Sequence, residues 1–408
     1  MEYRDVWVNL PEGYDALKQN VHRLAKEVVR PAAISLDRMG DAKQVVAPTS
    51  PLRQVLAAAY EHGYHAAAIP KGLGGLGLSG LEMHALLEEL GWGSAGIALA
   101  LLASSLPFVA LVTDGRTEMV DTFVKPFAAN KDASWIGCWA LSEPRHGSDA
   151  FLLGSDEFRY PTSSGQLVAR VEGEHYTVNG QKAAWISNGT IATHALCSVT
   201  VEPSKAMSAH ELLLIPLDLP GVSRGEPLSK LGQRALNQGS ISFQEVRIPR
   251  SFALRGEGFE LDLTRLLTFA NSSMAAALTG TARAAYEEAL AYSKQRVQGG
   301  KPICEHQLVQ KHLFDMFTRV EACRALSRAT IIYNQTATAP LLENAIAAKN
   351  FCTQVAFDVA NEALQLFGGT GISGEYLIEK LFRDARVALI EQGVNEVLSL
   401  AGARRILQ

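Results

Sequence analysis

The chain has 408 residues, of which 47% are hydrophobic and 20% charged, and its formal net charge is −4. This length is enough for two or three domains, and the composition is typical of a soluble globular protein. A weakly acidic chain gives no reason to expect a nucleic acid or an anionic membrane as a partner.

Cysteine content and the start of the chain argue against a metal-binding, a disulfide-rich or a secreted protein. The cysteines are odd in number, widely spaced and free of Cys-x-x-Cys pairs, so we expect neither a bound metal nor a disulfide framework. Residues 1–15 lack a basic segment followed by an apolar run, so we expect no signal peptide. A reducing cytoplasm is the simplest location for such a chain.

The first third of the chain is predicted to be helical. Apolar residues recur at three-to-four spacing over Tyr14–Leu36 and Pro51–Ala68. Ser79 and Glu82 form a capping pattern before a further helix. The glycine-rich segment 70–77 matches no phosphate-binding fingerprint and is predicted to be a tight connector.

One apolar run, Ser94–Val112, is long enough to cross a membrane. Gly96 and Pro107 interrupt it, and its centre consists of small residues. A pair of helices buried in a bundle is therefore the preferred interpretation, and no membrane partner is expected.

The middle of the chain is predicted to be a β domain. Short alternating apolar runs separated by turns fill the sequence from Ser134 to Pro249. The Asn179-Gly180 pair is a favoured two-residue hairpin turn, so a hairpin is predicted there.

After Pro249 the helical pattern returns, in four long runs typical of a four-helix bundle: Gly258–Val297, His306–Gln335, Ala339–Phe367 and Leu377–Leu407. Runs of one type segregated along a chain favour an α+β protein with separate domains. The predicted domains are helical over 1–133, β over 134–249 and a helical bundle over 250–408.

Four sequence motifs point to one family. They are Ala140–Asp149, Gly180–Gly189, Lys230–Arg234 with Phe243–Pro249 behind it, and the C-terminal block from Gln365 to Val394. In order and spacing they resemble the motifs of the acyl-CoA dehydrogenases, over residues 140–397. The resemblance implies that family's fold and an FAD cofactor.

The resemblance also implies which residues hold the flavin. Leu141, Ser142, Trp185 and Ser187 would contact the isoalloxazine ring, and Ser148 would lie at the pyrophosphate. Small hydroxyls and a flat indole suit the polar edges and the face of a flavin.

A second group of residues resembles a site shared between subunits. Arg296 and Gln307 match a family segment that reaches a neighbour's FAD, although Gly299-Gly300 stands where Phe-Gly is expected. Gln365, Gly368 and Gly369 resemble the loop that this segment meets. The resemblance therefore implies a homodimer or homotetramer.

The general base is the point at which the sequence departs from the family. The two positions that carry it in the family fall here on Gln392 and near Ala270, and the arginine usual beside the second is Asn271. A neutral amide cannot take a proton from carbon. Glu391 is either a substitute base or, as the pattern favours, an exposed or ion-paired carboxylate at a helix end. Arg383, Asp384 and Arg386 are predicted to form a structural ion-pair cluster.

The resemblance implies an FAD-dependent oxidoreductase acting on an acyl thioester of CoA or a carrier protein, with an electron-transfer partner or oxygen as acceptor. In that case Gln392 would still occupy the thioester pocket and polarise the carbonyl through its backbone N–H. The missing base leaves a flavin-dependent monooxygenase open, and also a base-independent β-elimination or enoyl reduction. A cofactor-binding relative without activity is a further alternative.

Overall fold

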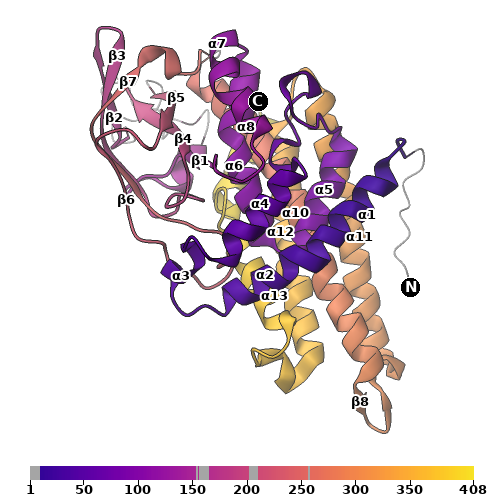
Figure 1. Cartoon of the computed structure of the whole chain (residues 1–408). Helices are drawn as coiled ribbons and strands as arrows, with labels where there is room; N and C mark the ends of the chain where they lie inside the picture. Colours follow the sequence, from indigo (N-terminus) through magenta and orange to yellow (C-terminus); the bar gives the residue numbers. More distant parts are fainter. Residues whose placement is uncertain (1–9, 153–154, 156–164, 202–209, 256–257) are drawn as a thin grey trace.

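The computed structural model describes residues 10–152, 155, 165–201, 210–255 and 258–408. Figure 1 shows the strands gathered on one side of the molecule and the long C-terminal helices on the other, with the N-terminal helices packed across them. The predicted α+β class, with helical, β and helical parts in chain order, is confirmed.

The N-terminal helices follow the predicted pattern closely. The α1 helix continues through a π turn, Ala25–Val29, directly into α2. The predicted capping box is present at α5: the Ser79 hydroxyl accepts from the Glu82 N–H, and the Glu82 carboxylate accepts from the Ser79 N–H at 2.8 Å. The helices are α1 Tyr14–Leu24, α2 Arg30–Asp37, α3 Ala42–Val46, α4 Pro51–Glu61, α5 Gly80–Gly93, α6 Ala95–Asp114, α7 Thr117–Met119 and α8 Lys125–Ala129.

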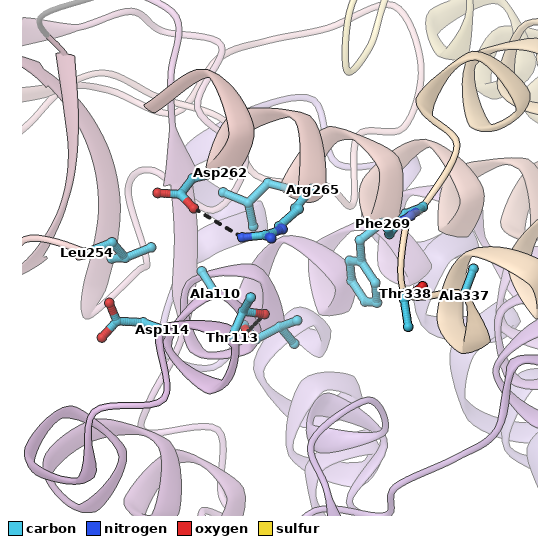
Figure 2. Close-up of a pocket in the computed structure, with 12 residues that line it drawn as sticks. Ala110, Thr113, Asp114, Leu254, Asp262, Arg265, Phe269, Ala337 and Thr338 are labelled. Atoms are coloured by element: carbon cyan, nitrogen blue, oxygen red, sulfur yellow. Dashed lines mark hydrogen bonds and ion pairs between the residues drawn. The ribbon is translucent and has the colours of Figure 1, made fainter. Parts of the chain in front are cut away.

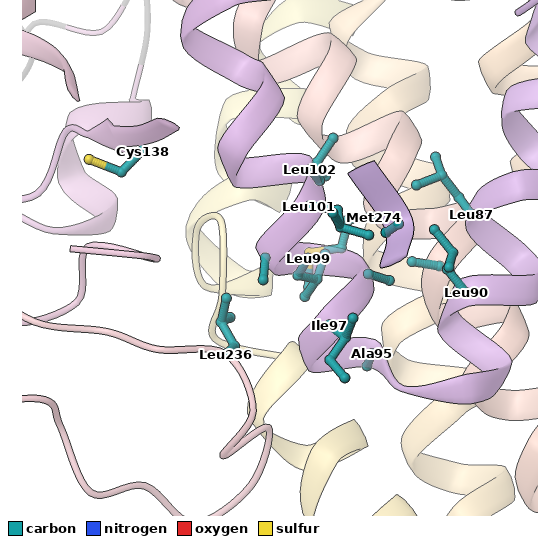
Figure 3. Close-up of a cluster of buried hydrophobic side chains, with 14 of the residues drawn as sticks. Leu87, Leu90, Ala95, Ile97, Leu99, Leu101, Leu102, Cys138, Leu236 and Met274 are labelled. Atoms are coloured by element: carbon teal, nitrogen blue, oxygen red, sulfur yellow. The ribbon is translucent and has the colours of Figure 1, made fainter. Parts of the chain in front are cut away.

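The long apolar run forms one helix, α6, rather than the predicted pair. Its length and composition would suffice to cross a membrane, but 89% of its most apolar window is buried inside the protein. Figure 3 shows Leu99 and Leu101 of this helix among side chains of α5 and Met274. The α6 helix is therefore covered by protein and forms the centre of the hydrophobic core.

The middle of the chain forms a seven-stranded sheet. β4 is buried along its whole length, and it pairs in parallel with β1 and antiparallel with β5. β2 and β3 form an antiparallel hairpin, which β7 and β6 extend. The strands are β1 Gly137–Ala140, β2 Val168–Glu172, β3 His175–Lys182, β4 His194–Thr200, β5 His210–Pro216, β6 Val222–Arg224 and β7 Ile241–Pro249.

The hairpin predicted at Asn179-Gly180 is wrong. β3 runs through this pair with a register shift, so the pair forms a bulge and not a turn. Gly180 is required there because its φ is 130° and a Cβ would lie 2.3 Å from the Gln166 carbonyl oxygen. The turn lies instead between Glu172 and His175, where Gly173 has a φ of 59°.

Three of the four predicted C-terminal helices are continuous: α10 Phe259–Gln295, α11 Gln307–Thr336 and α12 Leu342–Phe367. The fourth is divided into α13 Leu377–Ala388 and α14 Asn395–Ile406. The helix breaks because Gln392 and Gly393 have φ values of 52° and 101°, which a right-handed helix cannot contain. We call the intervening residues 389–394 the site turn.

A buried ion cluster joins α5 to the bundle. The carboxylate of Glu88 receives hydrogen bonds from Arg283 at 2.8 Å and from Arg324 at 2.9 Å. Burial alone would raise the pKa of Glu88, but Arg324 and Arg283 outweigh it and hold that pKa well below its usual range. The ionised carboxylate thus ties three helices together.

Glu88→Gln is expected to lower the free energy of unfolding by about 3 kcal/mol or more, because the substitution leaves two guanidinium groups buried without this anion. The effect should diminish in acid, where the lost carboxylate would be protonated in the wild type. Denaturation in urea measures it. Asp121→Asn, which breaks a half-exposed pair with Lys125, is the control and should change stability by less than about 1 kcal/mol. Equal effects of the two substitutions would contradict the expectation.

Candidate active site

A cavity of about 690 Å³ lies where the β domain meets α6 and the site turn, a volume typical of small-molecule and cofactor sites. Its walls are mostly apolar, with a few polar groups. The lining residues are Leu99, Ala103, Leu106, Trp139, Leu141, Ser142, Gly147, Ser148, Phe151, Trp185, Ile186, Ser187, Leu228, Ser229, Lys230, Leu231, Leu236, Gln238, Arg386, Val387, Ile390, Glu391, Gln392 and Gly393.

The five residues predicted to contact the flavin nucleus and pyrophosphate all line this cavity. Leu141 and Ser142 follow the end of β1, and Ser148 opens a short helical turn. Trp185 and Ser187 follow the end of β3. The structure therefore brings the first two sequence motifs to one wall.

A buried ion pair holds that wall in place. Lys182 donates to the Leu141 carbonyl oxygen at 3.1 Å and to the Glu143 carboxylate at 2.6 Å. The Ala183 N–H donates to the Ser142 carbonyl oxygen at 2.9 Å. These contacts join the end of β1 to the end of β3, so the two flavin motifs cannot move independently.

The polar groups on this wall fit a flavin ring. Within the described part of the chain, the Ser142 hydroxyl makes no hydrogen bond, and the Ser187 hydroxyl accepts only a long one, 3.4 Å, from Gln238. Trp185 is 62% exposed although it is large and apolar. Spare hydroxyls and an open indole face are what a planar heterocycle with polar edges requires.

The site turn forms the facing wall and is anchored on both sides. The Val394 N–H donates to the Ser148 hydroxyl at 3.0 Å, which leaves that hydroxyl its own proton to donate. The Lys349 ammonium donates to the Gly393 carbonyl oxygen at 2.7 Å. The backbone N–H groups of Glu391 and Gln392 make no hydrogen bond to any described residue. Adjacent unpaired N–H groups in a left-handed turn are a ready site for an oxyanion.

Glu391 is neither exposed nor ion-paired, so the favoured interpretation from the sequence is wrong. Both carboxylate oxygens are buried, and no described residue donates to them at an ordinary hydrogen-bond distance. Burial raises the pKa of this carboxyl above its usual value, and the charge of Lys230, the nearby Gln233 side chain and the charge of Lys349 offset part of the rise. The ammonium groups of both lysines are bonded elsewhere, Lys230 to the Leu236 carbonyl oxygen at 2.7 Å.

The two positions that carry the base in the family provide no carboxylate here. The Gln392 side-chain oxygen is buried without a hydrogen-bond partner within the described residues. Ala270 is fully buried in an apolar cluster and, like the buried Asn271, does not line the cavity. Of the described residues that line the cavity, Glu391 alone carries a carboxylate.

The predicted ion-pair cluster on α13 is only partly correct. Arg383 pairs with Asp37 at 2.6 Å, and Asp384 pairs with Lys380. Arg386 pairs with no described residue and lines the cavity instead. Lys230 and Gln238 also line the cavity, and the sequence did not predict either as a site residue. For Lys230 the sequence did contain a signal, because this residue opens the third motif.

The residues predicted to serve a neighbour's FAD do not line the cavity. Arg296, Gln307, Gln365, Gly368 and Gly369 are all exposed. Figure 1 shows β8 (Val297–Gln298), which follows Arg296, at the end of the long helices far from the sheet. Tyr292 links the two segments because its ring stacks on Phe367 at 4.0 Å and its hydroxyl lies 3.0 Å from that of Thr370. The role across a subunit interface stays a prediction.

A second, smaller cavity of about 260 Å³ lies between the end of α6 and the start of α10. Figure 2 shows Asp262 and Arg265 facing each other, with Ala110 and Thr113 nearby; the charged groups are 3.9 Å apart. Phe269, next to the second base position of the family, also lines it. It shares no described lining residue with the larger cavity.

Comparison with known proteins decides the family. Residues 11–131, 138–246 and 256–407 match, in turn, the N-terminal, middle and C-terminal domains of acyl-CoA dehydrogenase. The chain belongs to the acyl-CoA dehydrogenase family. Members of this family are FAD-dependent oxidoreductases.

Individual relatives match over nearly the whole chain. The chain is 30% identical to the short-chain specific acyl-CoA dehydrogenase of Rattus norvegicus mitochondria, over 98% of this chain and 92% of that protein. It is 30% identical to the probable acyl-CoA dehydrogenase YngJ of Bacillus subtilis, over 96% and 97%. The butyryl-CoA dehydrogenase structure from Megasphaera elsdenii matches with a TM-score of 0.87 and 27% identity, over 99% of this chain and 100% of that one.

Gly393→Ala is expected to displace the site turn. A Cβ there would lie 2.9 Å from Leu398 and 3.0 Å from Phe151, and the positive φ adds about 1–3 kcal/mol of strain. We expect a lower melting temperature and weaker FAD retention, measured by thermal denaturation and by flavin content after gel filtration. Gly374→Ala is the control, because a Cβ at Gly374 meets nothing within 4 Å. Unchanged flavin content in the Gly393 variant would contradict the expectation.

Proposed function

We propose that this protein removes two hydrogen atoms from the α- and β-carbons of an acyl thioester, with Glu391 as the base that takes the α-proton. The observation that carries the proposal is the buried, unpartnered carboxylate of Glu391 in the cavity wall. It is a residue of the type that the reaction needs, displaced by one position from the family's own. FAD, when bound, accepts the hydride of the β-carbon.

The environment of Glu391 suits a base. An apolar cavity raises the pKa of its carboxyl, so that the carboxylate binds a proton more readily than one in water. The nearby charges of Lys230 and Lys349 oppose that rise in pKa. No described residue donates to its oxygens at an ordinary hydrogen-bond distance, and the Gln233 side chain is an uncharged polar group near enough to lower its pKa.

The site turn would bind the thioester oxygen. Negative charge builds on that oxygen as the α-proton leaves, and the unpaired N–H groups of Glu391 and Gln392 are suited to stabilise it. Gln392 would then keep its place beside the thioester without acting as the base. Ser142, Trp185 and Ser187 would hold the FAD ring, and Ser148 its pyrophosphate.

The remaining parts of the proposal follow from the family. The acyl carrier is CoA or a carrier protein, and the electrons pass to an electron-transfer partner. The exposed residues Arg296, Gln307, Gln365, Gly368 and Gly369 would complete the FAD site of a second subunit in a homodimer or homotetramer. A cytoplasmic location agrees with the free cysteines.

Glu391→Gln is expected to lower kcat by about 10²–10⁴-fold, because it removes the base without changing the shape of the cavity. Anaerobic conversion of a saturated acyl-CoA to its α,β-unsaturated product, followed by mass spectrometry, measures the loss. In the wild type, kcat/KM should rise with pH as the carboxyl ionises, with an apparent pKa above the usual glutamate value; the variant should lack this limb.

Glu375→Gln is the matched control, because Glu375 is exposed and lies outside the cavity. A Glu391 variant as active as this control would overturn the proposal. So would oxygen consumption by the reduced holoenzyme with product hydroxylation and no need for a thioester, which the monooxygenase alternative requires.

Gln392→Glu is expected to raise α,β-dehydrogenation in the Glu391→Gln background, because it places a carboxylate at the family's own position. We expect recovery of at least about tenfold in kcat, a part of what a general base contributes. Single-turnover mixing with butyryl-CoA, followed by flavin absorbance, measures it. No recovery at all would indicate that the turn does not hold a thioester.

A further inference from the structure

We infer that Lys349 is a positioning residue for this reaction: it fixes the site turn through the Gly393 carbonyl and the Asn395 side chain, and so sets how the turn meets the thioester. The inference rests on the proposed function. Lys349 belongs to α12 and does not line the cavity, so it acts on the reaction without touching a molecule bound there.

Lys349 is placed so that its ammonium holds the end of the site turn. Its side chain is fully buried, and its ammonium donates to the Gly393 carbonyl oxygen and to the Asn395 side-chain oxygen, both at 2.7 Å. Asn395 is held in turn by Thr353, whose hydroxyl accepts from it at 3.1 Å. One amine on a continuous helix therefore bonds to both the end of the site turn and the first residue of α14.

Burying a lysine costs folding free energy unless its ammonium makes hydrogen bonds or ion pairs, which an apolar side chain cannot make. The turn needs such a group because its backbone is left-handed at Gln392 and Gly393 and cannot be held by helical hydrogen bonds. With the Gly393 carbonyl engaged by Lys349, the peptide between Gly393 and Val394 has a fixed orientation, and Val394 donates to Ser148. The unpaired N–H groups of Glu391 and Gln392 are then held in one arrangement.

The charge of Lys349 also acts on the base. Lys349 faces two carboxylates, Glu391 on the turn and Glu396 on α14. Glu391 also senses Lys230 from the β domain and Asp384 from α13. Burial lowers the pKa of Lys349 to about 7 and that of Lys230 to about 8. As pH rises through 7, Lys349 loses its proton, the Glu391 carboxylate loses a stabilising charge, and the anchor weakens.

The test uses the FAD-loaded full chain and the variant Lys349→Met, which fills the same space without an amine. We expect kcat to fall about 10²-fold, the effect of a small misplacement of reacting groups, with KM changed less than about threefold. In the wild type we expect kcat/KM to decline as the pH rises through about 7, and this decline should vanish in the variant. Lys125→Met, at an exposed lysine of α8, is the matched control.

A readout without turnover separates positioning from general loss of structure. A 3-thia acyl-CoA has an acidic α-proton but no β-hydrogen, so it is deprotonated without being oxidised. In the wild type we expect a long-wavelength absorbance band on its binding; in Lys349→Met we expect the band to fall severalfold at saturation while flavin content and melting temperature stay near those of the control.

The outcomes are distinguishable. If Glu391→Gln abolishes dehydrogenation but Lys349→Met keeps the wild-type kcat and the decline near pH 7, this inference is wrong and the proposed function stands. If Glu391→Gln remains fully active, both are wrong. If Lys349→Met fails to load FAD, Asn395→Ala decides, because it removes one of the two anchors and leaves the lysine; an unchanged kcat and pH profile in that variant would overturn the inference.

Discussion

A left-handed turn in the last third of the chain governs the site. Gln392 and Gly393 cannot continue a right-handed helix, so α13 ends and the chain exposes a stretch of backbone whose N–H groups have no helical partners. An unbroken helix would have used these donors internally. Because of this break, Glu391 lies in the cavity wall. In an uninterrupted helix its side chain would point in another direction. The proposed site thus includes a local interruption of regular structure that the rest of the fold stabilises.

The fold supplies that support from several directions. The Lys230–Arg234 loop of the β domain is pressed against α13: a Cβ on Gly232 would lie 2.3 Å from the Arg383 carbonyl oxygen, and Asp384 accepts a hydrogen bond from the Gln233 N–H. On the other side, α12 provides Lys349 and the first β motif provides Ser148. The turn therefore depends on tertiary contacts as well as on its own glycine, as is usual for strained backbone at functional sites.

The sequence predicted the architecture well because the physical signals for it are local. Three-to-four apolar spacing identified α10, α11 and α12, and alternation identified the strands. The errors have a common origin in tertiary context. Asn179-Gly180 has the chemistry of a turn, but the approach of Gln166 makes it a bulge. The last helix appeared continuous because nothing in its apolar period reveals that Lys349 holds a neighbouring carbonyl.

For the site, too, the sequence predicted the features with local signals and failed on those set by tertiary contacts. The motifs placed Leu141, Ser142, Ser148, Trp185 and Ser187 correctly on one cavity wall, since each follows a strand end that the sequence marks. The burial of Glu391 could not be predicted from the motifs, because burial of a single carboxyl depends on which segments of the chain cover it. Arg386 was misassigned for a related reason: Arg383 pairs with Asp37 on α2 and Asp384 pairs with Lys380 on α13 itself, whereas Arg386 lines the cavity.

The bond from Val394 to Ser148 joins residues that are 246 positions apart in the chain. The two cavity walls thus do not exist until the β domain and the C-terminal helices have found each other, a late and entropically demanding step for any polypeptide. A molecule bound between the two walls would stabilise the docked arrangement and shift the folding equilibrium toward the folded state by mass action. FAD bound at this site would therefore stabilise the docked arrangement of the two domains.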